Sequence, residues 1–279
     1  MNWISKNDTI IFNSLFNSKL NITLISKYAK LIFTDYELSE ELFDYYWNDN
    51  FNKSVNDGSK FNQDVSELPQ TLTCLIFGYA FNQNVSKLPQ SVIMIYFGYS
   101  FNQDVSNLPP FLTHLVFSLS FNQDVSILPL TLTHLTFCYP IEQDMLVLPP
   151  SLTHLILGYK WQFIQQFNIP PNIKYLRLNC NNKYIINSLP NSITELVLDK
   201  GFSLEMNNLP TSIKKLTINK SSYYNVDLNC LPDCIEELQL NCHYKKRILY
   251  VPSNLKKLIC HEDYPYKDDF KHLNVEIYE

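Results

Sequence analysis

Three consecutive rows of twenty residues decide the fold of this chain: FNQDVSELPQTLTCLIFGYA at 61–80, FNQNVSKLPQSVIMIYFGYS at 81–100 and FNQDVSNLPPFLTHLVFSLS at 101–120. Two similar rows follow, and the later rows keep the skeleton L-P-x-x-[LI]-x-x-L-x-[LI]. The marker prolines stand at positions 69, 89, 109, 129, 149, 170, 190, 210, 232 and 252, so the spacing stays between 20 and 22 residues. Such a constant spacing is typical of a solenoid, because equivalent residues of successive coils must stack.

Each row predicts one short strand. In the segment LTHLVF, the apolar residues Leu115 and Phe117 alternate with His114 and Val116, which is the period of a strand with one face inward. Stacked coils place these strands side by side in one parallel sheet, about 4.8 Å apart. The rest of each coil, about 14 residues with a proline, is too short for a second strand and a regular helix, so we expect extended or 3₁₀ backbone there.

The fold class that follows is a mainly β solenoid, a right-handed coil of about ten repeats with one parallel sheet. We expect an N-terminal cap at residues 1–60, the repeats at 61–260 and a C-terminal capping strand at 261–279. The capping-box spacing of Thr34 and Glu37 ahead of an apolar stripe predicts a short helix in the N-terminal cap. Residues 8–33 fit either a helix or a degenerate coil whose strand is 31–33.

The composition excludes several classes of protein. With 46% hydrophobic residues the chain can form a packed core, and a net charge of −5 gives no basic footprint for nucleic acid or an anionic membrane. The seven cysteines have no framework spacing, which favours reduced thiols inside a cell. Neither a signal-peptide pattern nor an apolar run of about 18 residues occurs, so we expect an intracellular protein without a membrane span.

Three groups of side chains invite a metal-site interpretation, and we favour a simpler one for each. The histidines at one position of successive rows would point in parallel rather than converge on a metal. The cysteines of residues 230–242 and His243 would be spread around the perimeter of their coils. The acidic column would hold like charges on neighbouring coils, which stay apart in water. The histidines are His114, His134 and His154. The acidic column is Asp64, Asn84, Asp104, Asp124 and Asp144. We expect no metal and no cofactor.

Recognised catalytic motifs do not occur in the sequence. The five glycines, at 58, 78, 98, 158 and 201, stand alone and cannot form a phosphate-binding loop. A nucleophile motif and a metalloprotease helix do not occur either. We therefore expect a protein that is not an enzyme and has no catalytic residues.

Two further columns are expected to be structural. The asparagines at 62, 82, 102 and 122 should hydrogen-bond the turn backbone of the adjacent coil. The column Tyr175, Glu195, Lys215, Glu237 and Lys257 alternates in sign and should form a self-paired ladder on the strands.

The rows resemble the FNIP repeat family, a branch related to leucine-rich repeats. The motif L-P-x-[ST]-L-T-x-L-x-F at 68–77 and F-N-Q-x-V at 81–85 carry the resemblance, which covers about residues 61–260. It implies a leucine-rich-repeat-like interaction module of the kind found in social amoebae and in giant viruses of amoebae, working in the cytoplasm of the host or source cell. Some members carry an F-box-like N-terminus, which implies a ubiquitin-ligase adaptor. Here Asp64 stands where the family often has Pro, and the first 50 residues lack the Leu-Pro opening of an F-box.

The predicted function is a non-enzymatic protein–protein interaction module that presents the exposed face of its sheet. Tyr and Arg are enriched at binding hot spots, and Met adapts to irregular surfaces. The residues expected to contact the protein partner are Met94, Tyr96, His114, His134, His154, Tyr175 and Arg177. The alternative function is a substrate-recognition adaptor that docks ubiquitin-ligase subunits through a degenerate F-box-like N-terminus. The alternative binding surface is the convex edge, or the loops after Gly78, Gly98 and Gly158.

Overall fold

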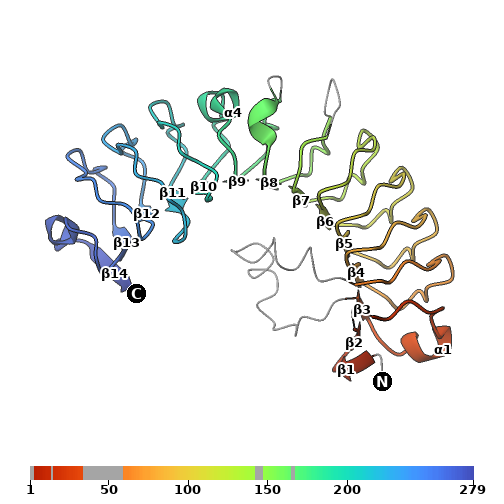
Figure 1. The fold of residues 1–279 in the computed structure, drawn as a ribbon. Coiled ribbons are helices and arrows are strands. Elements are labelled where there is room, and N and C mark those ends of the chain that lie inside the picture. Colours follow the sequence, from red (N-terminus) through yellow and green to blue (C-terminus); the bar gives the residue numbers. More distant parts are fainter. Residues whose placement is uncertain (1–2, 14, 34–58, 142–146, 165–166) are drawn as a thin grey trace. The chain divides into compact units, whose positions relative to one another are not determined.

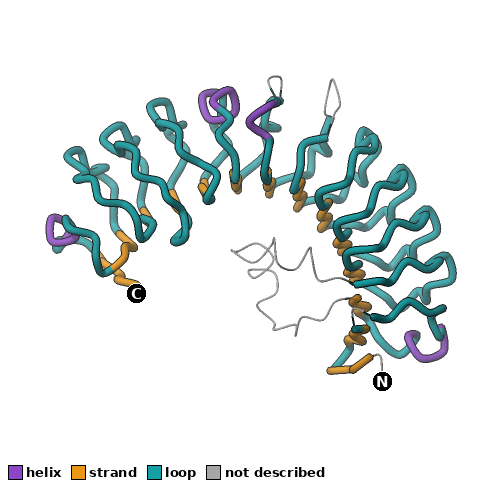
Figure 2. The backbone as a smooth tube through the Cα atoms, in the orientation of Figure 1, coloured by secondary structure: helices purple, strands orange, loops and turns teal. Residues whose placement is uncertain are grey.

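The structure is a computed structural model that describes residues 3–13, 15–33, 59–141, 147–164 and 167–279 (Figure 1). Its internal contacts divide the chain into two compact units, Met1–Ser151 and Leu152–Glu279. In both units the strands follow one side of the coils, and turns with short helices form the other side (Figure 2). Within the described residues, no helix is both long and apolar enough to span a membrane.

Unit 1 is a sheet of strands that pair in chain order. The strands are β1 (Trp3–Lys6), β2 (Thr9–Phe12), β3 (Lys30–Phe33), β4 (Cys74–Ile76), β5 (Met94–Tyr96), β6 (His114–Phe117) and β7 (His134–Phe137). β1 is antiparallel to β2, and every later pair is parallel. Cys74, Met94 and His114 are register partners in steps of twenty residues, which confirms the predicted stacking.

The described part of the N-terminal region pairs with the sheet of the repeats. β3 pairs with β2 and β4, so the degenerate coil ending in Phe33 is the correct alternative for this segment. A single helical turn, α1 (Ile22–Ile25), precedes it, and the Asn21 side chain accepts from the Leu24 N–H at its start. The coil resumes at Ser59, whose carbonyl accepts from the Ala80 N–H. The helix predicted from Thr34 onward falls in residues 34–58, outside the described residues.

Two columns of phenylalanine fill the core of unit 1. Phe97 at the end of β5 stacks on Phe101 with ring centroids 3.6 Å apart, and Phe77 stacks on Phe81 at 3.8 Å. Phe97 also lies 5.8 Å from Phe77, one coil away. The six inward residues predicted for the second row are all buried: Phe81, Val85, Leu88, Val92, Ile95 and Phe97. The rings therefore stack both within a coil and between coils.

An asparagine ladder joins the turns of the same coils. The Asn82 N–H donates to Asn62 Oδ1, the Asn102 N–H to Asn82 Oδ1 and the Asn122 N–H to Asn102 Oδ1, each at 2.9 Å. Each Oδ1 also accepts from the side-chain amide of the glutamine that follows in the next coil. These bonds confirm the predicted structural role, because they satisfy turn N–H groups that no strand pairs.

Unit 2 repeats the coil with different side chains. Its parallel strands are β8 (His154–Leu157), β9 (Tyr175–Leu178), β10 (Glu195–Leu198), β11 (Lys215–Ile218), β12 (Glu237–Gln239), β13 (Lys257–His261) and β14 (Asn274–Tyr278). On the turn side lie η1 (Trp161–Phe163), α4 (Lys183–Asn187) and η2 (Lys267–Phe270). The pairing of β14 with β13 confirms the predicted final strand.

In the core of unit 2, other residues occupy the positions that phenylalanines fill in unit 1. Leu178 and Leu198 take the place of the strand-end rings, and the second column is Trp161, Asn182, Phe202, Tyr224, Tyr244 and Tyr264, all buried. Asn182 explains α4, because its Oδ1 accepts the N–H groups of Tyr184 and Ile185 and so caps the helix. The hydroxyls of Tyr224 and Tyr264 donate to carbonyls of the preceding coil.

Candidate interaction surface

The strand face is the side of each sheet whose side chains point away from the core. In unit 1 it carries an apolar cluster of Ile11, Ile32, Cys74, Ile76, Tyr96, Val116 and Cys138, with Met94 and Leu119 packed against it. Neighbouring parallel strands bring these side chains into contact along the sheet. The strand face of unit 1 is therefore a second apolar layer rather than a row of separate solvated side chains.

Two predicted contact residues lie in this layer. Met94 is half-buried, and Tyr96 is buried between its register partners Ile76 and Val116. The expectation that the Tyr96 side chain is exposed is wrong, because its neighbours on the sheet pack against it. Met94 remains accessible at the start of β5.

His114 and His134 form a stacked pair on the same face. Their ring centroids are 4.0 Å apart at an interplanar angle of 16°, and both side chains are half-buried. The ring Nδ1 atoms lie 2.8 Å from the hydroxyls of Thr113 and Thr133. Because each hydroxyl also donates to a backbone carbonyl, the arrangement favours a proton on Nδ1 that the hydroxyl oxygen accepts.

The other three predicted residues belong to unit 2. His154 and Tyr175 are register partners whose rings stack with centroids 5.4 Å apart. Burial lowers the pKa of His154, and the nearby Glu195 carboxylate opposes that shift. His154 is therefore kept neutral at physiological pH, and Tyr175 is half-buried beside it.

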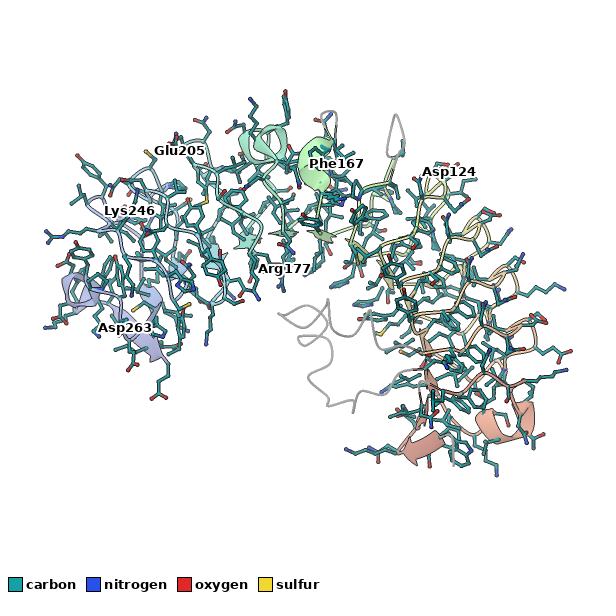
Figure 3. The ribbon with its side chains drawn as sticks, viewed as in Figure 1. Asp124, Phe167, Arg177, Glu205, Lys246 and Asp263 are labelled. Carbon is teal, nitrogen blue, oxygen red and sulfur yellow. The ribbon has the colours of Figure 1, made fainter. Side chains whose placement is uncertain are left out.

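Arg177 is held in a buried ion pair. Its side chain lies on the strand side of unit 2 (Figure 3), and the residue is only 5% exposed. Nε donates to Asp199 Oδ2 at 2.5 Å and Nη2 donates to Oδ1 at 2.8 Å, while the Asn219 amide donates to the same Oδ1. The expectation of an exposed Arg177 is wrong, because the carboxylate of the next coil binds the guanidinium in two places.

The predicted charge ladder is present on the rest of this face. Lys215 Nζ lies 3.0 Å from a carboxylate oxygen of Glu195 and 3.9 Å from one of Glu237. Lys257 pairs with Glu276 at 2.9 Å, and this hydrogen bond raises the pKa of Lys257. The strand face of unit 2 is thus largely paired with itself.

Sequence reasoning missed two features of these surfaces. Asp199 follows β10, two residues after Val197, the register partner of Arg177. Both side chains therefore lie on the same face of neighbouring coils, and the repeat spacing alone could have revealed this pairing. Tyr79 and Tyr99 follow the strands of successive rows, and their rings stack 4.8 Å apart. The signal for them is the recurring G-Y dipeptide after the strand.

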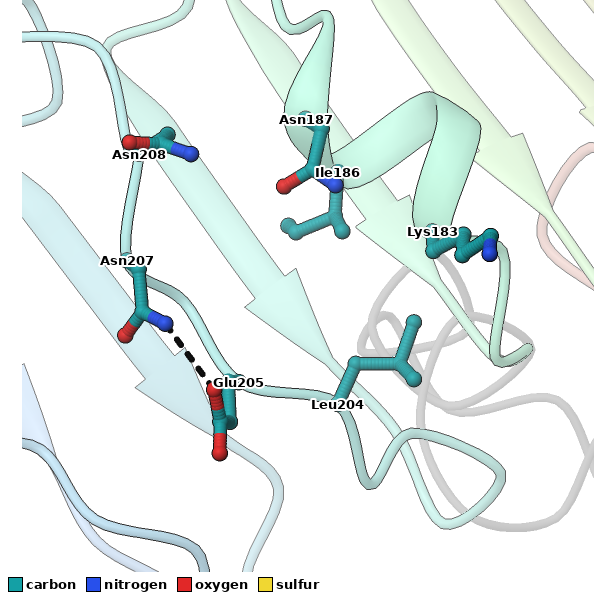
Figure 4. A pocket seen from close by; sticks show the side chains of 7 residues that line it. All are labelled: Lys183, Ile186, Asn187, Leu204, Glu205, Asn207 and Asn208. Atoms are coloured by element: carbon teal, nitrogen blue, oxygen red, sulfur yellow. Dashed lines mark hydrogen bonds between the residues drawn. The ribbon is translucent and has the colours of Figure 1, made fainter.

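A small cavity of about 350 Å³ opens on the turn side of unit 2 (Figure 4). It lies between α4 and residues 204–208, and the Asn207 amide donates to Glu205 at its rim. The lining is Lys183, Ile186, Asn187, Leu204, Glu205, Asn207 and Asn208. This lining holds no histidine, cysteine or serine.

The polar groups considered for metal binding occupy other roles. Among the residues that the structure describes, no group of three or more His, Cys, Asp or Glu lies close enough to hold a metal ion. Asp64, Asn84, Asp104 and Asp124 accept hydrogen bonds from the serine two residues later. All seven cysteines are free, and burial raises the pKa of Cys74 and of Cys180 to about 12, so these thiols stay protonated.

Comparisons with known proteins agree with this architecture. The crystal structure of CroV588, a giant-virus protein described as a novel circular leucine-rich-repeat protein, superposes with a TM-score of 0.66 and 27% identity over 95% of this chain. The chain spans 42% of that protein. No curated protein matches the sequence. The FNIP repeat model matches residues 61–100, 140–181, 162–201 and 180–221. The chain therefore carries FNIP repeats within a leucine-rich-repeat-like solenoid.

Proposed function

We propose that the chain is a non-enzymatic module that binds a protein partner through the strand face of unit 1. Solenoids of this type are typical protein-interaction modules and are generally scaffolds rather than catalysts. The partner contacts Met94 and the stacked histidines His114 and His134. The odd, unpatterned set of cysteines supports an intracellular place of action.

The difference between the two strand faces supports this choice. In unit 2, the ladder around Lys215 and the buried pair of Arg177 occupy the polar groups. In unit 1, Lys30 pairs with Asp8, and the face beyond this pair carries the apolar cluster and the stacked rings of His114 and His134. A partner that covers the half-buried Met94, His114 and His134 displaces fewer ion pairs than one that binds the strand face of unit 2.

Photo-crosslinking tests the proposal. A benzophenone amino acid replaces Met94 in one variant and Thr217, on the strand face of unit 2, in a matched control. We expect the Met94 variant to capture a specific protein in lysate of the source or host cell and the Thr217 variant to capture none. The purified partner should then bind His134→Ala more weakly than the parent chain. Equal capture at both positions contradicts the proposal.

The same experiment addresses the ubiquitin-ligase alternative. That role depends on the first 50 residues, of which 34–50 lie outside the described residues, and neither the family match nor the structural similarity supports it. Recovery of ligase subunits by the chain, lost on removal of residues 34–58, is the result expected of an adaptor.

A further inference from the structure

An exposed apolar patch lies in unit 1 on the turns around the L-P dipeptides, at a place distinct from the strand face. Phe111 is 64% exposed, Ile127 68%, Leu130 74% and Val147 61%. We call these four residues the turn patch. Large apolar side chains gathered in this way are uncommon on a protein surface that has no partner.

The repeat itself provides the control for this observation. At the position of Phe111 the earlier rows have Thr71 and Ser91, and at the position of Leu130 they have Gln70 and Gln90. At the position of Ile127 they have Glu67, Lys87 and Asn107. The coil therefore folds with polar residues at all three positions, and its architecture does not require apolar ones.

The turn patch is continuous across neighbouring coils. The Thr131 hydroxyl lies 2.8 Å from the carbonyls of both Pro110 and Leu112, which brings the turn that follows Leu130 against the turn that holds Phe111. Ile127 and Leu130 flank Leu128 and Pro129 in one turn. Val147 occupies the position of Ile127 in the following row.

A pair of carboxylates borders the patch. Asp104 and Asp124 are exposed. Asp124 stands three residues before Ile127, on the side of the coil away from the strands (Figure 3). Hydrogen bonds from Ser106 and Ser126 lower the pKa of each carboxyl, so both are ionised at neutral pH. Within the described part of the chain, neither carboxylate is in an ion pair with a cation.

We propose that the turn patch docks an amphipathic segment of a protein partner, whose apolar side chains cover Phe111, Ile127 and Leu130 and whose Lys or Arg side chains pair with Asp104 and Asp124. A helical segment with apolar residues at i, i+3, i+4 and i+7 presents this combination. The negative border disfavours the alternative of an anionic membrane surface. This surface goes beyond the strand-face proposal and can succeed or fail independently of it.

Two variants are designed from the repeat. The apolar variant combines Phe111→Ser, Ile127→Asn and Leu130→Gln, which copies Ser91, Asn107 and Gln90 of earlier rows. The charge variant combines Asp104→Asn and Asp124→Asn, which copies Asn84; the Asn84 side chain accepts the same two hydrogen bonds from Ser86. Phe163→Ser in unit 2 is the matched control, because Phe163 is 70% exposed and the described stretch around it, residues 147–164, contains no Asp or Glu.

The probe is a fluorescent amphipathic helical peptide of Leu and Lys, about 14 residues and so roughly 21 Å long. Its affinity for the full chain is measured by anisotropy at two salt concentrations. We expect the apolar variant to lose about tenfold or more in affinity. The charge variant should bind more weakly at low salt and lose most of the salt dependence. Phe163→Ser should bind like the parent chain.

Three results overturn the proposal. The first is that the apolar variant binds the peptide as tightly as the parent chain and has the same melting temperature. The second is that the same peptide with Glu in place of Lys binds equally well. The third is that the parent chain binds anionic lipid vesicles, or forms dimers through the patch, more strongly than it binds the peptide. None of these results bears on crosslinking at Met94, so the strand-face proposal is tested separately.

Discussion

Units 1 and 2 build one kind of coil from different side chains. In unit 1 phenylalanine rings stack within and between coils, asparagines join the turns, and the strand face is apolar. In unit 2 leucines end strands β8 to β10, a mixed column with three tyrosines replaces the second phenylalanine column, and the strand face is charged. A coil of 20–22 residues therefore needs inward side chains that fill its core and hydrogen-bond partners for the N–H groups of its turns. Different side chains can meet both needs.

The comparison also separates what folds the coil from what is left for a partner. Both units bury their inward residues almost completely, so the core does not distinguish them. The strand faces of the two units do differ, and the turn patch differs from the equivalent positions of earlier rows. The fold does not require particular side chains at these positions. Residues that vary between equivalent positions of one solenoid are thus the natural candidates for recognition.

The largest effect is expected from opening a hole in the ring columns of unit 1. Phe97→Ala removes a ring that contacts Phe101 within the coil and Phe77 and Phe117 in its neighbours. The free energy of unfolding should fall by about 3–5 kcal/mol. Phe97→Leu copies Leu178 of unit 2 and should lose less than half as much. Urea denaturation of both variants measures the difference, and equal losses would show that unit 1 depends on ring stacking itself.

A slightly smaller loss is expected from the buried ion pair of unit 2. Arg177→Ala leaves the Asp199 carboxylate buried without its cation, at a cost of about 3 kcal/mol. The double variant Arg177→Val with Asp199→Cys copies Val116 and Cys138 of unit 1, and it should regain most of the loss. If the double variant is no more stable than Arg177→Ala in thermal denaturation, the two strand faces are not interchangeable.

The charge ladder should contribute less. Lys215→Glu puts a third carboxylate between Glu195 and Glu237, on side chains that are about one third exposed. We expect a loss of about 1 kcal/mol or less, because solvent screens such pairs. The loss should shrink in high salt, and Lys215→Met at the same position separates charge repulsion from packing. A loss that does not depend on salt contradicts the ladder.

The smallest effect concerns the turn carboxylates of unit 1. Hydrogen bonds from Ser106 lower the pKa of Asp104 from its ordinary value of 3.8. Because the folded-state pKa lies below the unfolded one, the stabilisation is complete above about pH 4 and is lost as pH falls through the folded value. Ser106→Ala should move the pKa of Asp104 back toward its ordinary value, as followed by NMR titration of the side-chain carboxyl. Because the backbone N–H at this position remains and is the larger cause, only part of the shift should be lost, and an unchanged pKa would show that the Ser106 hydroxyl does not contribute.

The sequence predicts the repeated features well because each is confirmed many times over by its neighbours. The inward set of the second row, the parallel register and the asparagine column all depend on equivalence between rows. Features that occur once are harder to predict. Asn182 replaces an aromatic residue in its column, and only the structure shows that it caps α4 instead.

The exposure of the candidate surface was harder to predict, because alternation along a strand indicates which way a side chain points but not whether neighbouring side chains cover it. Tyr96 and Arg177 both point away from the core, as the period of two predicts. Tyr96 is nevertheless buried by side chains on the adjacent strands, and Arg177 by a carboxylate 22 residues later. The histidine pair was correctly placed in one column, but its ring stacking and its threonine partners depend on side-chain conformations that a sequence does not specify.

The asparagine ladder has a consequence for how such a chain can change its length. Each of the three coils in residues 61–120 accepts the same bond from the coil after it and donates the same bond to the coil before it, beginning with the Asn62 N–H and Asn17 Oδ1. Excision of residues 81–100 would bring the Asn102 N–H to Asn62 Oδ1 and Phe101 to Phe77, so that the join reproduces contacts already made. We therefore expect a chain that gains or loses one whole row to make the same contacts at the join, and each added row supplies three turn positions whose side chains the coil leaves free to vary.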